Sequence, residues 1–251
     1  MYNRARSDDA ATQTRLERRT RAFHQEADVA DPASLDAFRA RHTVQPEDKL
    51  LTGLANCPFL GLVDAASGRV GCLVHPLQND GLDGRDCGVY DRHTCQDYLC
   101  AAHDVLREDE RRLVVAAIDD SWLYGLVVTD PRFVRELFSL TASRAGAMPR
   151  RPATERPQAL AAALAYFELK RDWPYRAPDA IFGQLRAGDG LDTPRRAGPS
   201  TALGVEPDPH EAVLRCLGTD VDDLAALAHA RRLVSSRVEA FASACVPREI
   251  A

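Results

Sequence analysis

The most constraining feature of this chain is the crowding of its cysteines. Five of the seven cysteines fall within residues 57–100 of a chain of 251 residues, where an even spread would place about one. The five are Cys57, Cys72, Cys87, Cys95 and Cys100. The N-terminus lacks the apolar core of a signal peptide, so we expect a cytoplasmic protein with reduced thiols. In that compartment clustered cysteines serve metal binding or catalysis more often than disulfides.

The segment that carries these cysteines contains little regular structure. Residues 59–63 and 69–74 are short apolar runs around a Gly-containing turn, and they predict a β-hairpin that brings Cys57 near Cys72. Residues 76–94 carry Pro76, are rich in Gly and Asp, and predict an irregular loop. Such a segment is too small to fold alone, and a bound metal ion can supply the missing folding free energy.

We therefore predict a tetrathiolate metal centre. Thiolates are soft ligands that suit zinc or an iron–sulfur cluster, and four of them complete the site. The predicted ligands are Cys57, Cys72, Cys95 and Cys100, with Cys87 as the reserve for Cys72. Zinc is the favoured cofactor, and an iron–sulfur cluster is the alternative. No Cys-x-x-Cys pair is present, so a core of buried small hydrophobic cysteines also stays open.

The remaining cysteines and the nearby histidines are not predicted to be primary metal ligands. Cys216 and Cys245 lie among apolar residues of predicted helices and are expected to be core residues. His75 could replace a cysteine ligand, but a turn residue is the favoured interpretation. His93 and His103 lie close to predicted ligands in the sequence and could tune them through hydrogen bonds.

Three short motifs carry a family resemblance. They are Cys57-Pro-Phe-Leu60, Gly71-Cys-Leu-Val-His75 and the stretch from Arg92 to Cys100. Together they resemble the elements of a zinc- or iron-chelating cysteine-cluster family that includes flagellin lysine N-methylase-like proteins. The resemblance covers only residues 57–100 and implies metal chelation without a particular reaction.

The chain also departs from that family. The leading paired-cysteine element is missing, and the spacing between the middle and last elements is long. Cys87-Gly-Val-Tyr90 also resembles the middle element, so Cys72 and Cys87 compete for one ligand position. We favour Cys72, because the hairpin places it near Cys57 without help from the loop.

The rest of the chain predicts a mainly α fold with a small cysteine-rich hairpin and loop module. We expect N-terminal helices in 1–56, the metal-binding module in 57–103 and a helical region in 104–251, all within one compact domain. Apolar periodicity and capping signals place the individual helices. Helices are expected at 8–25, from 32, at 46–54, from 104, from 131, at 160–169 and at 219–245, with linkers at 148–158 and 188–209.

Composition narrows the classes of function. The net charge of −5 and an aromatic content of 6% argue against nucleic-acid binding. No apolar run approaches the roughly 20 residues of a membrane span. Asp119-Asp120 is expected to cap a helix rather than to act as an acid–base pair.

The leading hypothesis is a metal-binding protein whose centre is chiefly structural, serving an unknown protein partner or small molecule. An iron–sulfur enzyme, methyltransferase-like by the resemblance, is the first alternative. A thiol-based redox sensor that uses Cys87 is the second. Whether the protein is an enzyme stays open.

Overall fold

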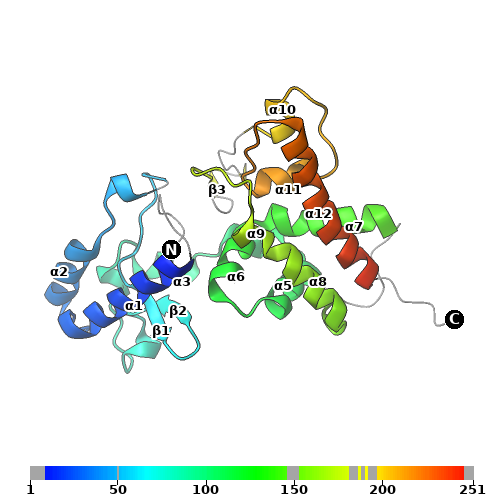
Figure 1. The fold of residues 1–251 in the computed structure, drawn as a ribbon. Helices are drawn as coiled ribbons and strands as arrows, with labels where there is room; N and C mark the ends of the chain where they lie inside the picture. Colours follow the sequence, from blue (N-terminus) through cyan, green and yellow to red (C-terminus); the bar gives the residue numbers. More distant parts are fainter. Residues whose placement is uncertain are drawn as a thin grey trace. The chain divides into compact units, whose positions relative to one another are not determined.

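The structure is a computed structural model, and it describes residues 9–49, 51–145, 153–180, 186–187, 190–191 and 197–245. It is mainly helical with a small antiparallel hairpin, as the sequence predicts (Figure 1). The chain divides into two compact units, Met1–Leu99 and Cys100–Ala251, and each has its own hydrophobic core. Every helix in the described ranges is too short or too polar to cross a bilayer.

The first unit combines short helices with one hairpin. Its elements are α1 (Asp9–Glu26), α2 (Pro32–His42), η1 (Pro46–Asp48), β1 (Leu60–Asp64), β2 (Arg69–Cys72), η2 (Pro76–Gln78), η3 (Arg85–Cys87) and α3 (Arg92–Asp97). The helix expected at 46–54 is wrong, because the described residues of this range form only the single 3₁₀ turn η1, and Lys49 directly after it has an extended backbone. The loop expected at 76–94 ends in α3, where Asp91 caps the helix by accepting from the Thr94 amide at 2.7 Å.

The hairpin forms where the sequence predicts it. Leu60 of β1 lies opposite Cys72 of β2 in an antiparallel pair. The turn is closed by the Asp64 carboxylate, which accepts from two backbone amides, and by Gly68 at φ +66. Helix α1 covers β1, and its Thr20 hydroxyl accepts from the amide of Leu62 at 2.8 Å.

The core of the first unit is small and largely aromatic. Phe38 and Phe59 stack with their ring centroids 5.8 Å apart, and Phe23 packs edge-on against both. The buried residues of this core are Phe23, Leu35, Phe38, Phe59, Leu73 and Val74, with Cys57, Cys72 and Cys87 partly buried against them. Leu16, Val44 and Leu62 are buried as well, so the described part of this 99-residue unit buries nine hydrophobic side chains, which is a small core.

The second unit is a helical assembly. Its elements are α4 (Ala101–Val105), α5 (Glu108–Ala117), α6 (Ser121–Val128), α7 (Pro131–Ala145), η4 (Ala153–Glu155), α8 (Pro157–Phe167), α9 (Leu169–Asp172), β3 (Arg186–Ala187), β4 (Gly190–Leu191), α10 (Pro199–Ala202), α11 (Glu211–Cys216) and α12 (Leu224–Cys245). Helix α12 packs against α7 and α8. Cys216 and Cys245 are buried in this core, as expected. Part of the linker expected at 188–209 forms α10, and 188–189 and 192–196 lie outside the described residues.

Helix boundaries in the second unit follow local capping and tertiary bonds. Asp120 caps α6 by accepting from the Leu123 amide at 2.8 Å, which confirms the predicted role of this acidic pair as a cap. Helix α12 begins at Leu224, not at Thr219 as expected. The Thr219 hydroxyl instead accepts from the indole N–H of Trp173 at 3.0 Å, so a tertiary bond replaces the expected cap.

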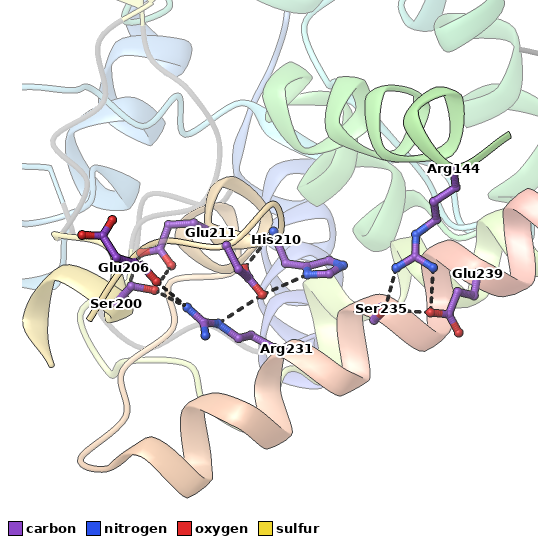
Figure 2. Close-up of polar contacts among 9 residues, drawn as sticks. Arg144, Ser200, Glu206, His210, Glu211, Arg231, Ser235 and Glu239 are labelled. Carbon is purple, nitrogen blue, oxygen red and sulfur yellow. Dashed lines mark hydrogen bonds and ion pairs between the residues drawn. The ribbon is translucent and has the colours of Figure 1, made fainter. Parts of the chain in front are cut away.

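A polar network joins the segment before α11 to α12. Arg231 of α12 pairs with Asp208 at 3.2 Å and donates to the Ser200 hydroxyl at 2.8 Å (Figure 2). A separate and more exposed pair joins α7 to α12, where Arg144 lies 2.6 Å from Glu239. Both contacts fasten the long C-terminal helix to the rest of its unit.

Candidate metal centre

Two of the predicted ligands meet at the open end of the hairpin. Cys57 lies three residues before β1, and its carbonyl accepts from the amide of Leu60, the residue paired with Cys72. Both thiols are partly buried against the small core. The pKa of Cys72 is raised to about 11, chiefly by burial and to a smaller extent by the charge of a thiolate at Cys57. The hairpin thus brings Cys57 and Cys72 close enough for the charge of a Cys57 thiolate to raise the pKa of Cys72.

The third thiol is that of Cys95, which belongs to α3. Cys95 is exposed, and its Sγ lies 3.9 Å from the carbonyl oxygen of Tyr90. Desolvation raises the pKa of Cys95, and a thiolate at Cys57 adds to that effect. A thiolate at Cys95 in turn raises the pKa of Cys72. Three thiols from three separate segments therefore interact with one another in the first unit.

The charge of one arginine acts on two of these thiols. Arg85 binds the carboxylate of Asp83 through two bonds of 2.8 and 2.6 Å, and the two side chains are only 11% and 17% exposed. The bonds to Arg85 lower the pKa of Asp83 to about 2. The positive charge of Arg85 lowers the pKa of both Cys72 and Cys95, against the larger effect of burial. The sequence interpretation missed this pair, although Asp83-Gly-Arg85 stands between predicted ligands.

Close packing fixes the turn that carries Arg85. The Gly84 amide donates to the carbonyl of Val74 at 3.1 Å, at the exit of the hairpin. A Cβ at Gly84 would lie 2.7 Å from Leu35 of α2 and 3.0 Å from Val74. The turn can approach this closely only because the residue has no side chain.

Cys87 faces a different neighbourhood. It ends η3, and burial raises its pKa, while the charges that act on it come from Asp36, Arg39 and Asp86. Asp36 and Arg39 belong to α2, so the side chain of Cys87 lies beside that helix. Cys87 nevertheless packs against the same small core as Cys57 and Cys72, so the choice between Cys72 and Cys87 as a ligand stays a prediction.

Cys100 is the first residue of the second unit. It precedes α4, its carbonyl accepts from the amide of His103 at 2.9 Å, and its side chain packs partly buried against the core of that unit. His103 is exposed and lies 3.1 Å from Asp104. In the first unit, His75 Nδ1 accepts from the Leu77 amide at 3.1 Å and so serves the turn η2, whereas His93 is exposed.

The three grouped thiols do not yet form a ligand set. In the part of the chain that the structure describes, no three His, Cys, Asp or Glu side chains are already placed to hold one metal ion. Comparisons with family models, with curated proteins and with solved structures found no match. The chemistry of the site is therefore argued from its own residues.

Solvent can reach Cys57 from the side of α1. A shallow hollow opens next to Cys57 and gives this thiol an exposed flank. Its lining residues are Thr12, Arg15, Leu16, Arg19, Asn56, Cys57 and Leu60. A metal site needs an entry path of this kind.

Proposed function

We propose that this protein binds a metal ion through the thiolates of Cys57, Cys72 and Cys95, and that the centre is chiefly structural. The observation that carries the proposal is the placement of Cys57 and Cys72 at the open end of one hairpin. Tyr90 links Cys95 to the same end, because its carbonyl lies 3.9 Å from Cys95 Sγ and its hydroxyl donates to the Ala55 carbonyl at 3.3 Å. Zinc is the favoured ion, because structural sites built from thiolates are typically tetrahedral zinc sites. Each thiol loses its proton when it binds.

The small core of the first unit supports a structural role. Nine buried hydrophobic side chains in its described part are few for a unit of 99 residues, and chains with so little core commonly depend on a metal or disulfides. From β2 to Leu99 the chain forms only the short turns η2 and η3 and the six-residue helix α3. A metal ion that joins Cys57, Cys72 and Cys95 stabilises this segment by linking it to the hairpin.

The test is metal content, measured by elemental analysis of protein purified anaerobically. We expect about one zinc ion per chain, with four ligands in total. Cys72→Ser and Cys95→Ser should lose the metal, whereas Cys87→Ser, a matched control from the same unit, should keep it. Metal that survives in Cys95→Ser, or that is lost only in Cys87→Ser, would contradict the proposed ligands.

The same preparation identifies the ion and the fourth ligand. Brown protein with absorbance near about 400 nm would indicate an iron–sulfur cluster in place of zinc. Cys100 is the fourth ligand predicted from the sequence, and Cys100→Ser tests that role. Loss of zinc from Cys100→Ser supports Cys100 as the fourth ligand, and retained zinc assigns the fourth position to water or another side chain.

A further inference from the structure

Two arginines line the hollow beside Cys57. Helix α1 packs on β1, and the hollow lies between this helix and the segment that leads into the strand (Figure 1). Arg15 and Arg19 contribute from α1, and Asn56 and Cys57 contribute from the segment before β1. Among the described residues that line the hollow, none is acidic. Its charged lining is therefore entirely positive.

Hydrogen bonds hold both guanidinium groups at the wall of the hollow. Arg15 Nη2 donates to the Thr12 hydroxyl at 2.7 Å, and Arg19 Nη1 donates to the Leu60 carbonyl at 3.1 Å. Thr12 and Leu60 line the hollow as well, so the charged ends of both arginines lie beside it. Both arginines are half-buried, and Thr12 is buried. The two positive charges thus have fixed positions instead of extending into bulk solvent.

This pair of charges is unfavourable for α1 by itself. Residues four apart lie on the same face of a helix, and like charges at that spacing destabilise it. Glu17, the acidic residue between the two arginines, is exposed and accepts from Gln13 at 2.9 Å. A bound anion would replace the repulsion with attraction, and a guanidinium matches an oxyanion through two parallel hydrogen bonds. A phosphate group carries about −1.5 to −2 at neutral pH, which balances two guanidinium charges.

We propose that this hollow binds a phosphate group, held by the guanidinium groups of Arg15 and Arg19 next to the thiol of Cys57. The inference goes beyond the proposed function and does not depend on it, because neither arginine is a metal ligand. Inorganic phosphate and a phosphate ester present the same oxyanion, and the experiment separates them. An occupied hollow also restricts the access of reagents to Cys57, so this thiol can report on the site.

The experiment measures local positive charge at Cys57 in full-length, metal-free protein. Iodoacetate is an anion and iodoacetamide is neutral, but both alkylate the same thiolate, forming a carbon–sulfur bond as iodide leaves. The ratio of their rates at Cys57, read by mass spectrometry, cancels the reactivity of the thiol itself. We expect this ratio to fall roughly fivefold in Arg15→Gln and by a similar factor in Arg19→Gln, the effect of losing one unit charge about 4 Å away in water.

Arg18→Gln is the matched control. It removes the same charge from the same helix, but Arg18 is exposed and does not line the hollow. The ratio at Cys57 should stay at the wild-type value in this variant, and it should stay high in Arg15→Lys, which keeps the charge. The ratio at Cys87, which belongs to η3 next to α2, should not change in any variant. Equal decreases in Arg15→Gln and Arg18→Gln would overturn the site, because they would show only the general charge of α1.

Competition identifies the ligand. Inorganic phosphate should slow iodoacetate at Cys57 more than potassium chloride of the same ionic strength does, and the difference should disappear in Arg15→Gln. Protection no greater than that of chloride would overturn the proposal. Stronger protection by adenosine monophosphate than by inorganic phosphate supports the site and assigns it to a phosphate ester, and the reverse order supports it as a site for free phosphate.

Arg19 also bonds the backbone of β1, so the folding of its variant is checked by circular dichroism. If Arg19→Gln is unfolded, Arg15→Gln decides, because the bond from Arg15 to Thr12 lies within α1. A folded Arg15→Gln with the wild-type rate ratio and wild-type protection by phosphate would overturn the inference. The zinc content of the protein does not enter this test, so the inference and the proposed function can fail separately.

Discussion

Lys170 Nζ lies 2.5 Å from Asp130 Oδ2 in the second unit, and both side chains are fully shielded from solvent. The ammonium also donates to the carbonyl of Cys216 at 2.8 Å and lies 5.1 Å from the centre of the Phe133 ring. Asp130 precedes α7 and Lys170 belongs to α9. The pair therefore joins two helices through a contact that water does not reach.

Removing one partner of this pair should destabilise the second unit strongly. We expect Lys170→Met to lower its free energy of unfolding by about 3–5 kcal/mol, because Asp130 stays buried without its cation. The double variant with Asp130→Asn should recover much of the loss. Urea unfolding followed by tryptophan fluorescence measures this, since Trp122 and Trp173, the two tryptophans of the chain, both lie in the second unit. A single variant within about 1 kcal/mol of wild type would contradict the prediction.

The two arginines drawn in Figure 2 should differ in their contributions to stability. Arg231→Met removes the pair with Asp208 and the bond to Ser200, both partly buried, and should cost on the order of 2–3 kcal/mol. Arg144→Met removes an exposed pair with Glu239 and should cost less than about 1 kcal/mol. The same fluorescence assay compares them, and equal losses would show that burial does not govern these contacts.

Acid should weaken the turn that holds Arg85. The folded-state pKa of Asp83 is lowered from 3.8 to about 2 by Arg85, so its contribution to stability is present above about pH 4 and lost as the pH falls toward 2. We expect on the order of 1 kcal/mol for this side chain, reduced by solvent screening. Hydrogen exchange of the residues 83–88 in metal-free protein, corrected for intrinsic rates, measures it. Asp83→Asn should flatten the pH dependence, and an unchanged profile would rule out this assignment.

Thiol reactivity should report both burial and metal binding. In metal-free protein at neutral pH, Cys95 should be alkylated faster than Cys72, because Cys95 is exposed and burial raises the pKa of Cys72 to about 11. Added zinc should protect Cys57, Cys72 and Cys95 while Cys87 keeps its rate. Pulsed alkylation read by mass spectrometry gives the rate at each position. Equal protection of Cys87 would place it in the ligand set.

The hairpin and the helix after Asp130 could be predicted because local rules determine them. Short apolar runs and the turn at Gly68 specify the strands, and Asp130-Pro131 marks a helix start. The hairpin in turn implied that Cys57 and Cys72 are neighbours. Metal binding itself stays a prediction.

The features that could not be predicted depend on contacts between distant residues. Thr219 has the composition of a helix cap, but its hydroxyl bonds Trp173, which lies 46 residues away. Lys170 and Asp130 are 40 residues apart, and neither carries a local signal for an ion pair. Arg85 stood in a segment that composition marked as an irregular loop, so the low exposure of its pair with Asp83 emerged only from the fold.

The packing of Gly84 has a consequence for genetics. Because Leu35 and Val74 leave no room for a side chain there, helix α2 and the exit of the hairpin jointly decide where Arg85 stands. Substitutions at Leu35, remote from every thiol in the sequence, should then shift this turn against the exit of the hairpin that ends at Cys72, and so alter metal retention. A random-mutagenesis screen for zinc-deficient variants would be expected to return hits in α2 as well as in the cysteine-rich segment.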